Sequence, residues 1–151
     1  MMTNEAPTHS VSVAGVVIDE TEQVLVIQRR DNGHWEPPGG VLELGETFEQ
    51  GVQREVFEET GVQVTVDRLT GVYKNMKRGI VALVYRCSPK AGRPRTSNEA
   101  TSVRWIDGDQ IDVFMSPAYA ARVHDAFRPT ASSRAHDGVD LIDASLNHTT
   151  P

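Results

Sequence analysis

The sequence predicts one α/β domain in which helices cover a sheet, and three observations support this fold class. The 151 residues match the usual size of a single domain that buries its own core. Runs rich in β-branched residues alternate with two stretches of helical apolar spacing. The order along the chain is strands, helix, strands, helix, which is typical of a mixed α/β domain.

Two strands and a shaped loop are predicted at the start of the chain. Residues 9–19 are rich in valine and end in the turn-prone run Asp-Glu-Thr-Glu. Residues 23–30 are predicted as the hairpin partner of this first strand. After the turn signal Asp-Asn-Gly, residues 34–40 hold two prolines and two glycines, which exclude a regular helix.

A helix is predicted over residues 47–60. Thr47 can cap its amino end, and Gly61 follows its last turn as a stop signal. Positions four apart form one apolar stripe that should pack against the sheet. These positions are Phe48, Val52 and Val56.

The rest of the chain predicts three strands, a second helix and a polar tail. The strands are expected at residues 62–73, 79–87 and 102–106. The second helix is expected at 117–127, with Ser116 as its cap and Pro117 at its first position. We therefore divide the chain into a domain of residues 1–128 and a tail of residues 129–151. The tail is expected either to be flexible or to be an arm that packs on this chain or on a second copy in a homodimer.

Composition and charge exclude some function classes. The formal net charge of −6 argues against a general nucleic-acid binder, which would carry a basic surface. No run approaches the 18 apolar residues that a membrane span needs, and the polar start does not resemble a secretory signal. We expect a cytoplasmic protein with no membrane partner. The single cysteine, Cys87, lies in an apolar run and is given no chemical role.

The acidic residues are concentrated in one part of the sequence. Seven glutamates lie between Glu36 and Glu59, with only Arg54 to offset them. Such a cluster repels itself unless a cation lies among the carboxylates. Three of these glutamates are three or four positions apart on the predicted helix and share a face. They are Glu55, Glu58 and Glu59.

From Gly40 to Val62 the chain matches a known signature at every specified position. The run GVLELGETFEQGVQREVFEETGV is similar to the Nudix box, GX5EX7REUXEEXGU, where U is aliphatic. A chance match to seven fixed residues in one window is less frequent than about one in 10^8. The chain therefore resembles the Nudix hydrolases, and in particular the small MutT-like members. The resemblance implies the Nudix fold, an α/β/α sandwich with a mixed sheet.

The resemblance also implies a metal site on the predicted helix. Glu55 and Glu59 match the box positions that usually ligate the metal, and Glu58 is a second ligand or a general base. The carbonyl of Gly40, a residue without Cβ, can approach a metal closely. Oxygen ligands of this kind suit Mg²⁺, with Mn²⁺ as a substitute. The competing interpretation, a solvated acidic face, leaves the complete box match unexplained.

Three further residues are assigned supporting or catalytic roles by the resemblance. Arg54 and Glu46 typically brace the helix and its preceding loop, and Arg54 also has the spacing to pair with Glu58. In some family members the general base comes from a later loop. Glu99 is the candidate there, as metal ligand or base, against the alternative of an ordinary solvated loop charge.

Four residues are candidate substrate contacts. The resemblance implies that the second strand lies beside the phosphate path, so Arg29 or Arg30 is expected to clamp a phosphate, against the alternative of a basic strand end in water. Trp35 and Tyr73 are candidates for stacking on a nucleobase, although isolated aromatic residues near a sheet more often belong to the core.

The expected function is Mg²⁺-dependent hydrolysis of the diphosphate linkage in a nucleoside diphosphate derivative. Signatures of ADP-ribose hydrolases and of dinucleoside polyphosphate hydrolases are missing: Lys77 and Arg78 lie near the expected position, and Tyr73 comes too early. A (deoxy)nucleoside triphosphate pyrophosphohydrolase is therefore the leading hypothesis. The alternatives are an ADP-ribose or nucleotide-sugar pyrophosphatase and, in another class, a Nudix module that binds a nucleotide without cleaving it.

Overall fold

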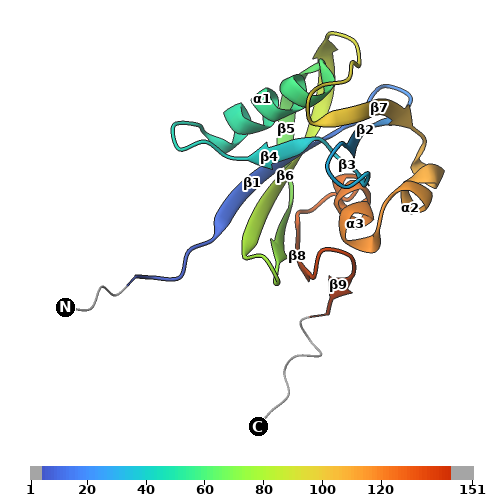
Figure 1. The fold of residues 1–151 in the computed structure, drawn as a ribbon. Helices are drawn as coiled ribbons and strands as arrows, with labels where there is room; N and C mark the ends of the chain where they lie inside the picture. The colour runs from blue at the N-terminus through green and yellow to red at the C-terminus, as the bar shows by residue number, and fades with distance from the viewer. Residues whose placement is uncertain (1–4, 144–151) are drawn as a thin grey trace.

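In the computed structural model, which describes residues 5–143, a mixed sheet is covered by helices on its two faces (Figure 1). The strand order is β4 (Gly39–Val41), β1 (Ser10–Val17), β6 (Ile80–Ala91), β5 (Gln63–Asn75), β8 (Ser132–His136) and β9 (Leu141–Ile142). The β1–β6 and β5–β8 pairs are parallel, and the others are antiparallel. A second sheet has the order β3 (Trp35–Glu36), β2 (Val24–Arg29) and β7 (Ala100–Ile106).

The core is divided in two by the sheets. Successive residues of β1 point to opposite faces, so Val13 and Val17 pack in the cluster under α1 (Phe48–Thr60). Val16 packs in the other cluster, with side chains of α2 (Ile111–Phe114) and α3 (Pro117–Ala126). A short 3-10 helix, η1 (Gly108–Gln110), leads into α2. This arrangement confirms the predicted α/β/α sandwich with a mixed sheet.

Helix α1 begins and ends at the residues that the sequence predicts. The Thr47 hydroxyl accepts the Gln50 N–H, and the Gln50 side chain accepts the Thr47 N–H, a reciprocal cap. Gly61 ends the helix in the left-handed conformation, at φ 78°. Val52 and Val56 are fully buried as predicted, but Phe48 is 43% exposed. The predicted stripe is therefore wrong at Phe48, because burial depends on what lies opposite the helix as well as on its period.

The predicted hairpin between the first two strands is wrong. The tight turn exists, since the Asp19 carboxylate accepts the backbone N–H groups of Thr21 and Gln23. Beyond one bridge between Ile18 and Val24, however, the strands separate into different sheets. The physical reason is that a strand has two edges, and those of β1 bond to β4 and β6.

The ordered part of the chain extends past the predicted boundary at residue 128. Strand β8 runs parallel to β5, and β9 returns antiparallel to β8. The polar side chain of Arg134 is bound by both carboxylate oxygens of Asp125, each at 2.7 Å. Strands β8 and β9 therefore extend the main sheet of this chain, while the division at residue 128 stays a prediction. Residues 144–151 lie outside the described part.

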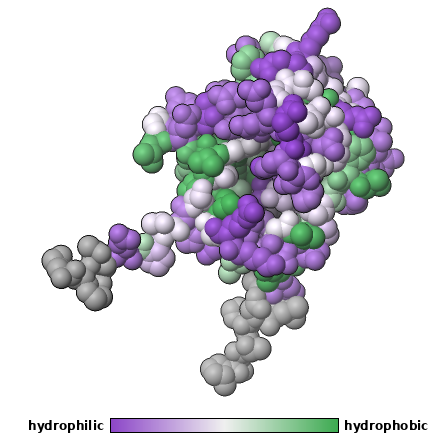
Figure 2. Space-filling view, in the orientation of Figure 1, coloured by the Kyte–Doolittle hydropathy of each residue, from purple (hydrophilic) through white to green (hydrophobic). Residues whose placement is uncertain are grey.

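The described residues include no helix that is long and apolar enough to span a membrane. The face seen in Figure 2 is mainly hydrophilic, with smaller hydrophobic groups over the β4–α1 loop and near α2. Exposed large side chains in these regions include Val41, Leu44 and Val113. Single exposed apolar side chains of this kind are normal for a protein surface.

Candidate active site

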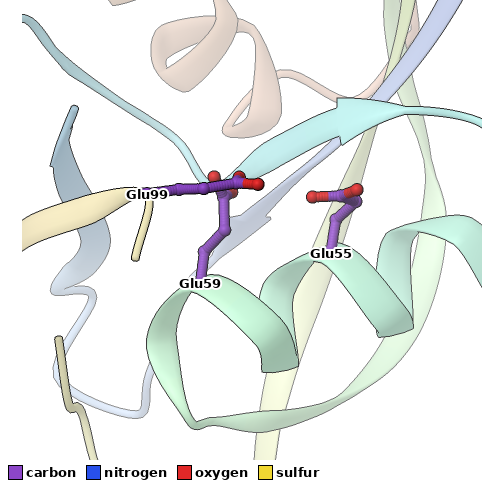
Figure 3. A group of neighbouring side chains, drawn as sticks. All are labelled: Glu55, Glu59 and Glu99. Carbon is purple, nitrogen blue, oxygen red and sulfur yellow. The ribbon is translucent and has the colours of Figure 1, made fainter. Parts of the chain in front are cut away.

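Three carboxylates from two distant parts of the sequence converge beside β4. Glu55 and Glu59 project from α1, and Glu99 reaches over them from the residue before β7 (Figure 3). One oxygen from each lies within 4.8 Å of the others. Two of the three belong to the predicted metal site, and the third is the glutamate proposed from the later loop.

Glu99 is held in place by Arg30, one of the two arginines considered as a phosphate clamp. Because β2 and β7 pair antiparallel, the Arg30 N–H donates to the Glu99 carbonyl at 2.9 Å. The Arg30 guanidinium donates to the carbonyls of Ser97 and Asn98. Arg30 thus fastens the loop that carries Glu99. Its side chain does not line the cleft that runs from the β4 glycines towards α3.

The two glycines of β4 allow the carboxylates to approach the strand. The Gly39 N–H donates to Oε1 of Glu59 at 2.7 Å. A Cβ on Gly40 would lie 2.6 Å from Oε2 of Glu55, which is closer than any side chain tolerates. Gly40 therefore cannot be replaced without moving the Glu55 carboxylate. The proposed role of its carbonyl as a metal ligand stays a prediction.

Arg54 braces the loop and the helix through several contacts. Its guanidinium donates to both oxygens of Glu46, at 2.6 and 2.8 Å, and to Glu55 at 2.7 Å. It also donates to the Val41 carbonyl at 3.1 Å. The hydrogen bond from Arg54 lowers the pKa of Glu46 to about 2. Arg54 therefore contacts both the loop, at Glu46, and the carboxylate group, at Glu55. Its pairing with Glu58, the one that the spacing predicts, is the longest of its carboxylate hydrogen bonds.

Glu58 lies apart from the other two helix glutamates. Its side chain is 57% exposed and accepts a longer hydrogen bond, 3.3 Å, from Arg54. Glu58 borders a hollow together with Glu59 and Glu99, but it does not belong to the group of three. Glu58 therefore lies at the edge of the carboxylate group and is more exposed than Glu55 and Glu59. Its role as a ligand or base stays a prediction.

The electrostatics of the cluster favour a bound cation. Burial raises the pKa of Glu59 to about 9, and Glu55 and Glu99 add to this shift. Burial also raises the pKa of Glu55, although Arg54 opposes the shift. Buried carboxylates that repel one another are stabilised as anions by a hard cation such as Mg²⁺, which prefers oxygen ligands. The donor set therefore fits the predicted metal.

We expect the metal-free protein to lose stability as the pH rises from 7 to 9. In this window the unfolded chain has an ionised Glu59 while the folded protein retains the proton, so the folded state binds more protons and its stability falls with pH. Thermal unfolding in chelator at several pH values measures this. Glu59→Gln should remove that part of the slope, and Mg²⁺ should restore more stability at pH 9 than at pH 7. Equal slopes for the two proteins would show that Glu59 is already ionised.

A cleft of about 530 Å³ extends from the β4 glycines towards α3. A hollow is visible near the centre of the face in Figure 2. Arg29, Lys77 and Arg78 all line this cleft, whereas Arg29 is also paired with Asp31 at 2.6 Å and with Glu36 at 3.1 Å. The cleft therefore has basic groups on its walls and carboxylates beside one end, an arrangement that suits a phosphorylated ligand.

The two aromatic candidates lie outside this cleft. Tyr73 is fully buried, and its hydroxyl donates to Asp125 at 2.6 Å. Its prediction as a stacking residue is wrong, because β5 directs this ring into the core. Trp35 packs edge to face on Phe114, with centroids 5.1 Å apart, and lines a smaller hollow of about 250 Å³.

Three residues of the cleft were missed from the sequence. Glu36, Tyr119 and Arg122 all line it. Arg122 could have been found from the sequence, because it lies between alanines and a valine in a predicted helix. A charged side chain at such a position faces either solvent or a group that binds the charge. Glu36 and Tyr119 gave no such signal, because only the tertiary structure brings β3 and α3 to the same cleft.

Comparison with known proteins identifies the family of the chain. The NUDIX domain matches residues 8–129. A MutT-like protein of Streptomyces ambofaciens is 58% identical over 139 residues, 91% of this chain and 90% of that protein. An ADP-ribose pyrophosphatase of Methanocaldococcus jannaschii is 32% identical over 65% of this chain and 62% of that protein.

Solved structures show the same fold. The crystal structure of a NUDIX hydrolase from Nitrosomonas europaea aligns with a TM-score of 0.76 at 20% identity. It covers 87% of this chain and 82% of that chain. The complete box, the convergent carboxylates and the family match lead to one conclusion. This chain is a Nudix hydrolase and belongs to the Nudix family.

Proposed function

We propose that this protein is a Mg²⁺-dependent pyrophosphohydrolase of (deoxy)nucleoside triphosphates that releases the monophosphate. The observation that carries the proposal is the placement of Glu55, Glu59 and Glu99 beside one end of a cleft with basic walls. The strong similarity to a MutT-like protein supports the same class. The acidic net charge of −6 favours a small nucleotide over a nucleic-acid polymer.

Each group of the site has a task in this reaction. Glu55, Glu59, Glu99 and the Gly40 carbonyl would hold the cation. Bound there, Mg²⁺ would neutralise diphosphate oxygens and lower the pKa of the attacking water. Arg54 orients Glu55 through its 2.7 Å hydrogen bond. The proton of the water is taken by a carboxylate, for which Glu99 and Glu58 are the candidates because both border the hollow at the cluster.

A second candidate is an ADP-ribose or nucleotide-sugar pyrophosphatase. The similarity to the Methanocaldococcus jannaschii ADP-ribose pyrophosphatase favours it, and the same carboxylates would serve the same bond type. A non-catalytic binding module is less consistent with the site, because every carboxylate of the box is retained. Mn²⁺ is expected to replace Mg²⁺, since it accepts the same oxygen ligands.

We expect metal-dependent release of nucleoside monophosphate from triphosphates. The purified protein is incubated with nucleoside triphosphates, 8-oxo-dGTP, ADP-ribose, nucleotide sugars and dinucleoside polyphosphates, in Mg²⁺, in Mn²⁺ and in chelator. The expected result is that triphosphates have the highest kcat/KM and that chelator abolishes turnover. A preference for ADP-ribose or a nucleotide sugar would replace the first candidate with the second. Binding of nucleotides with no turnover of any substrate would support the binding module.

A further inference from the structure

The Arg122 side chain is a buried cation that lacks the hydrogen bonds a guanidinium normally makes. Arg122 is 9% exposed, and its Nε has no hydrogen-bond partner among the described residues. Its guanidinium lies over the rings of Tyr73 and Tyr119, at 5.2 and 4.6 Å from their centroids. These rings fix the side chain and supply cation–π contacts, but they accept no conventional hydrogen bond. A buried donor without a partner lowers the stability of the fold, because its desolvation is not compensated by a hydrogen bond.

Among residues 5–143, the polar side chain within hydrogen-bond range of Arg122 is His136, and it does not accept from Arg122. The His136 Nε2 lies 3.5 Å from Nη2 of Arg122. The His136 Nδ1 accepts the Gly138 N–H at 3.0 Å, and burial lowers the pKa of His136. The neutral ring therefore carries its proton on Nε2, so both facing nitrogens are donors. His136 therefore supplies no acceptor to the Arg122 guanidinium.

The position of Arg122 indicates where that acceptor comes from. Arg122 lines the cleft whose other end reaches Gly39 and Gly40, beside the carboxylate cluster. A nucleotide with its phosphates at the cluster would direct its base away from the metal end. Glu36 lines the same cleft and acts electrostatically on Arg122. With the phosphates at the carboxylate cluster, the group that reaches Arg122 would be a neutral acceptor, such as the edge of a base.

We propose that Arg122 is the specificity-determining residue of the cleft and binds the O6 and N7 edge of a guanine-type base. This inference rests on the proposed nucleotide hydrolysis. Guanine presents O6 and N7 as adjacent acceptors, which match a guanidinium bidentately. Adenine presents N7 next to the N6 amino donor, and arginine has no acceptor to offer that donor. Hypoxanthine keeps both acceptors and lacks only the N2 amino group, so it should behave as guanine does.

The test compares kcat/KM for dGTP, dITP and dATP in Mg²⁺. We expect the wild type to prefer dGTP and dITP over dATP by about 10-fold or more. Arg122→Gln should reduce kcat/KM for dGTP and dITP by roughly 10- to 100-fold while dATP changes by less than about 3-fold, so the preference collapses. Arg122→Lys, which keeps the charge but not the bidentate fork, should retain an intermediate preference. The matched control is Arg104→Gln, because Arg104 lies over two aromatic rings as well but does not line the cleft.

The outcomes separate this inference from the proposed function. An unchanged dGTP to dATP ratio in Arg122→Gln, or an equal collapse in Arg104→Gln, overturns the inference and leaves the function intact. Should Arg122→Gln fail to fold by circular dichroism, a wild type that treats dATP as well as dGTP overturns it. Binding of GMP and AMP is measured by calorimetry in parallel. If no triphosphate is hydrolysed, yet the wild type prefers GMP and Arg122→Lys weakens that preference, the function fails and the inference holds.

Discussion

Replacement of Glu59 by glutamine is expected to reduce kcat for hydrolysis about 1,000-fold, which corresponds to about 4 kcal/mol. Glu59 is buried, belongs to the carboxylate group and accepts the Gly39 N–H at 2.7 Å. Glutamine keeps the size and an oxygen acceptor for that N–H, but it removes the negative charge that a cation requires. The fold should therefore persist while metal binding weakens. Initial rates at saturating substrate, over a range of Mg²⁺ concentrations, measure the effect.

The matched control for this change is Glu49→Gln. Glu49 lies on the same helix, is exposed and is not part of the carboxylate group, so its replacement should change kcat less than about 2-fold. Circular dichroism and thermal unfolding in chelator establish that both variants are folded. Full activity of Glu59→Gln at ordinary Mg²⁺ concentrations would contradict the assignment of this carboxylate to the metal site.

Replacement of Asp125 by asparagine is expected to lower the free energy of unfolding by about 3 kcal/mol and the Tm by roughly 6–12 °C. The Asp125 carboxylate is 1% exposed and accepts from Arg134 twice, at 2.7 Å each, and from the Tyr73 hydroxyl at 2.6 Å. Asparagine offers one oxygen in place of two and no charge for the guanidinium. The link between α3, β5 and β8 is then weakened.

Tyr73→Phe is the graded control for the same cluster. It removes one hydrogen bond and no charge, so we expect a loss of about 1 kcal/mol. Chemical denaturation of both variants and of the wild type gives the comparison. If Asp125→Asn unfolds like the wild type, the pairing of β8 with the rest of the domain adds little to stability, which would favour the flexible tail over the packed arm.

The local elements of this protein were determined by the sequence itself. Thr47 and Gly61 mark the ends of α1 because caps depend on neighbouring residues in the chain. The spacing of Glu55 and Glu59 places both carboxylates on one helix face for the same reason. The Nudix box is contiguous, so its match from Gly40 to Val62 needs no tertiary information. The fold class, the family and the helix members of the carboxylate group could therefore be predicted, whereas Glu99 was a candidate with an open alternative.

Tertiary structure alone decided which distant residues meet. Glu99 joins the cluster because β7 pairs with β2, and the same pairing turns Arg30 into the support of its loop. Tyr73 is buried and Arg122 lines the cleft because α3 packs across β5 beside β8. A periodic pattern shows which side of a helix or strand is apolar, but it does not show which other element packs against that side. Strand pairing and helix packing decide this, and with it the choice between a solvated charge, a core residue and a ligand contact.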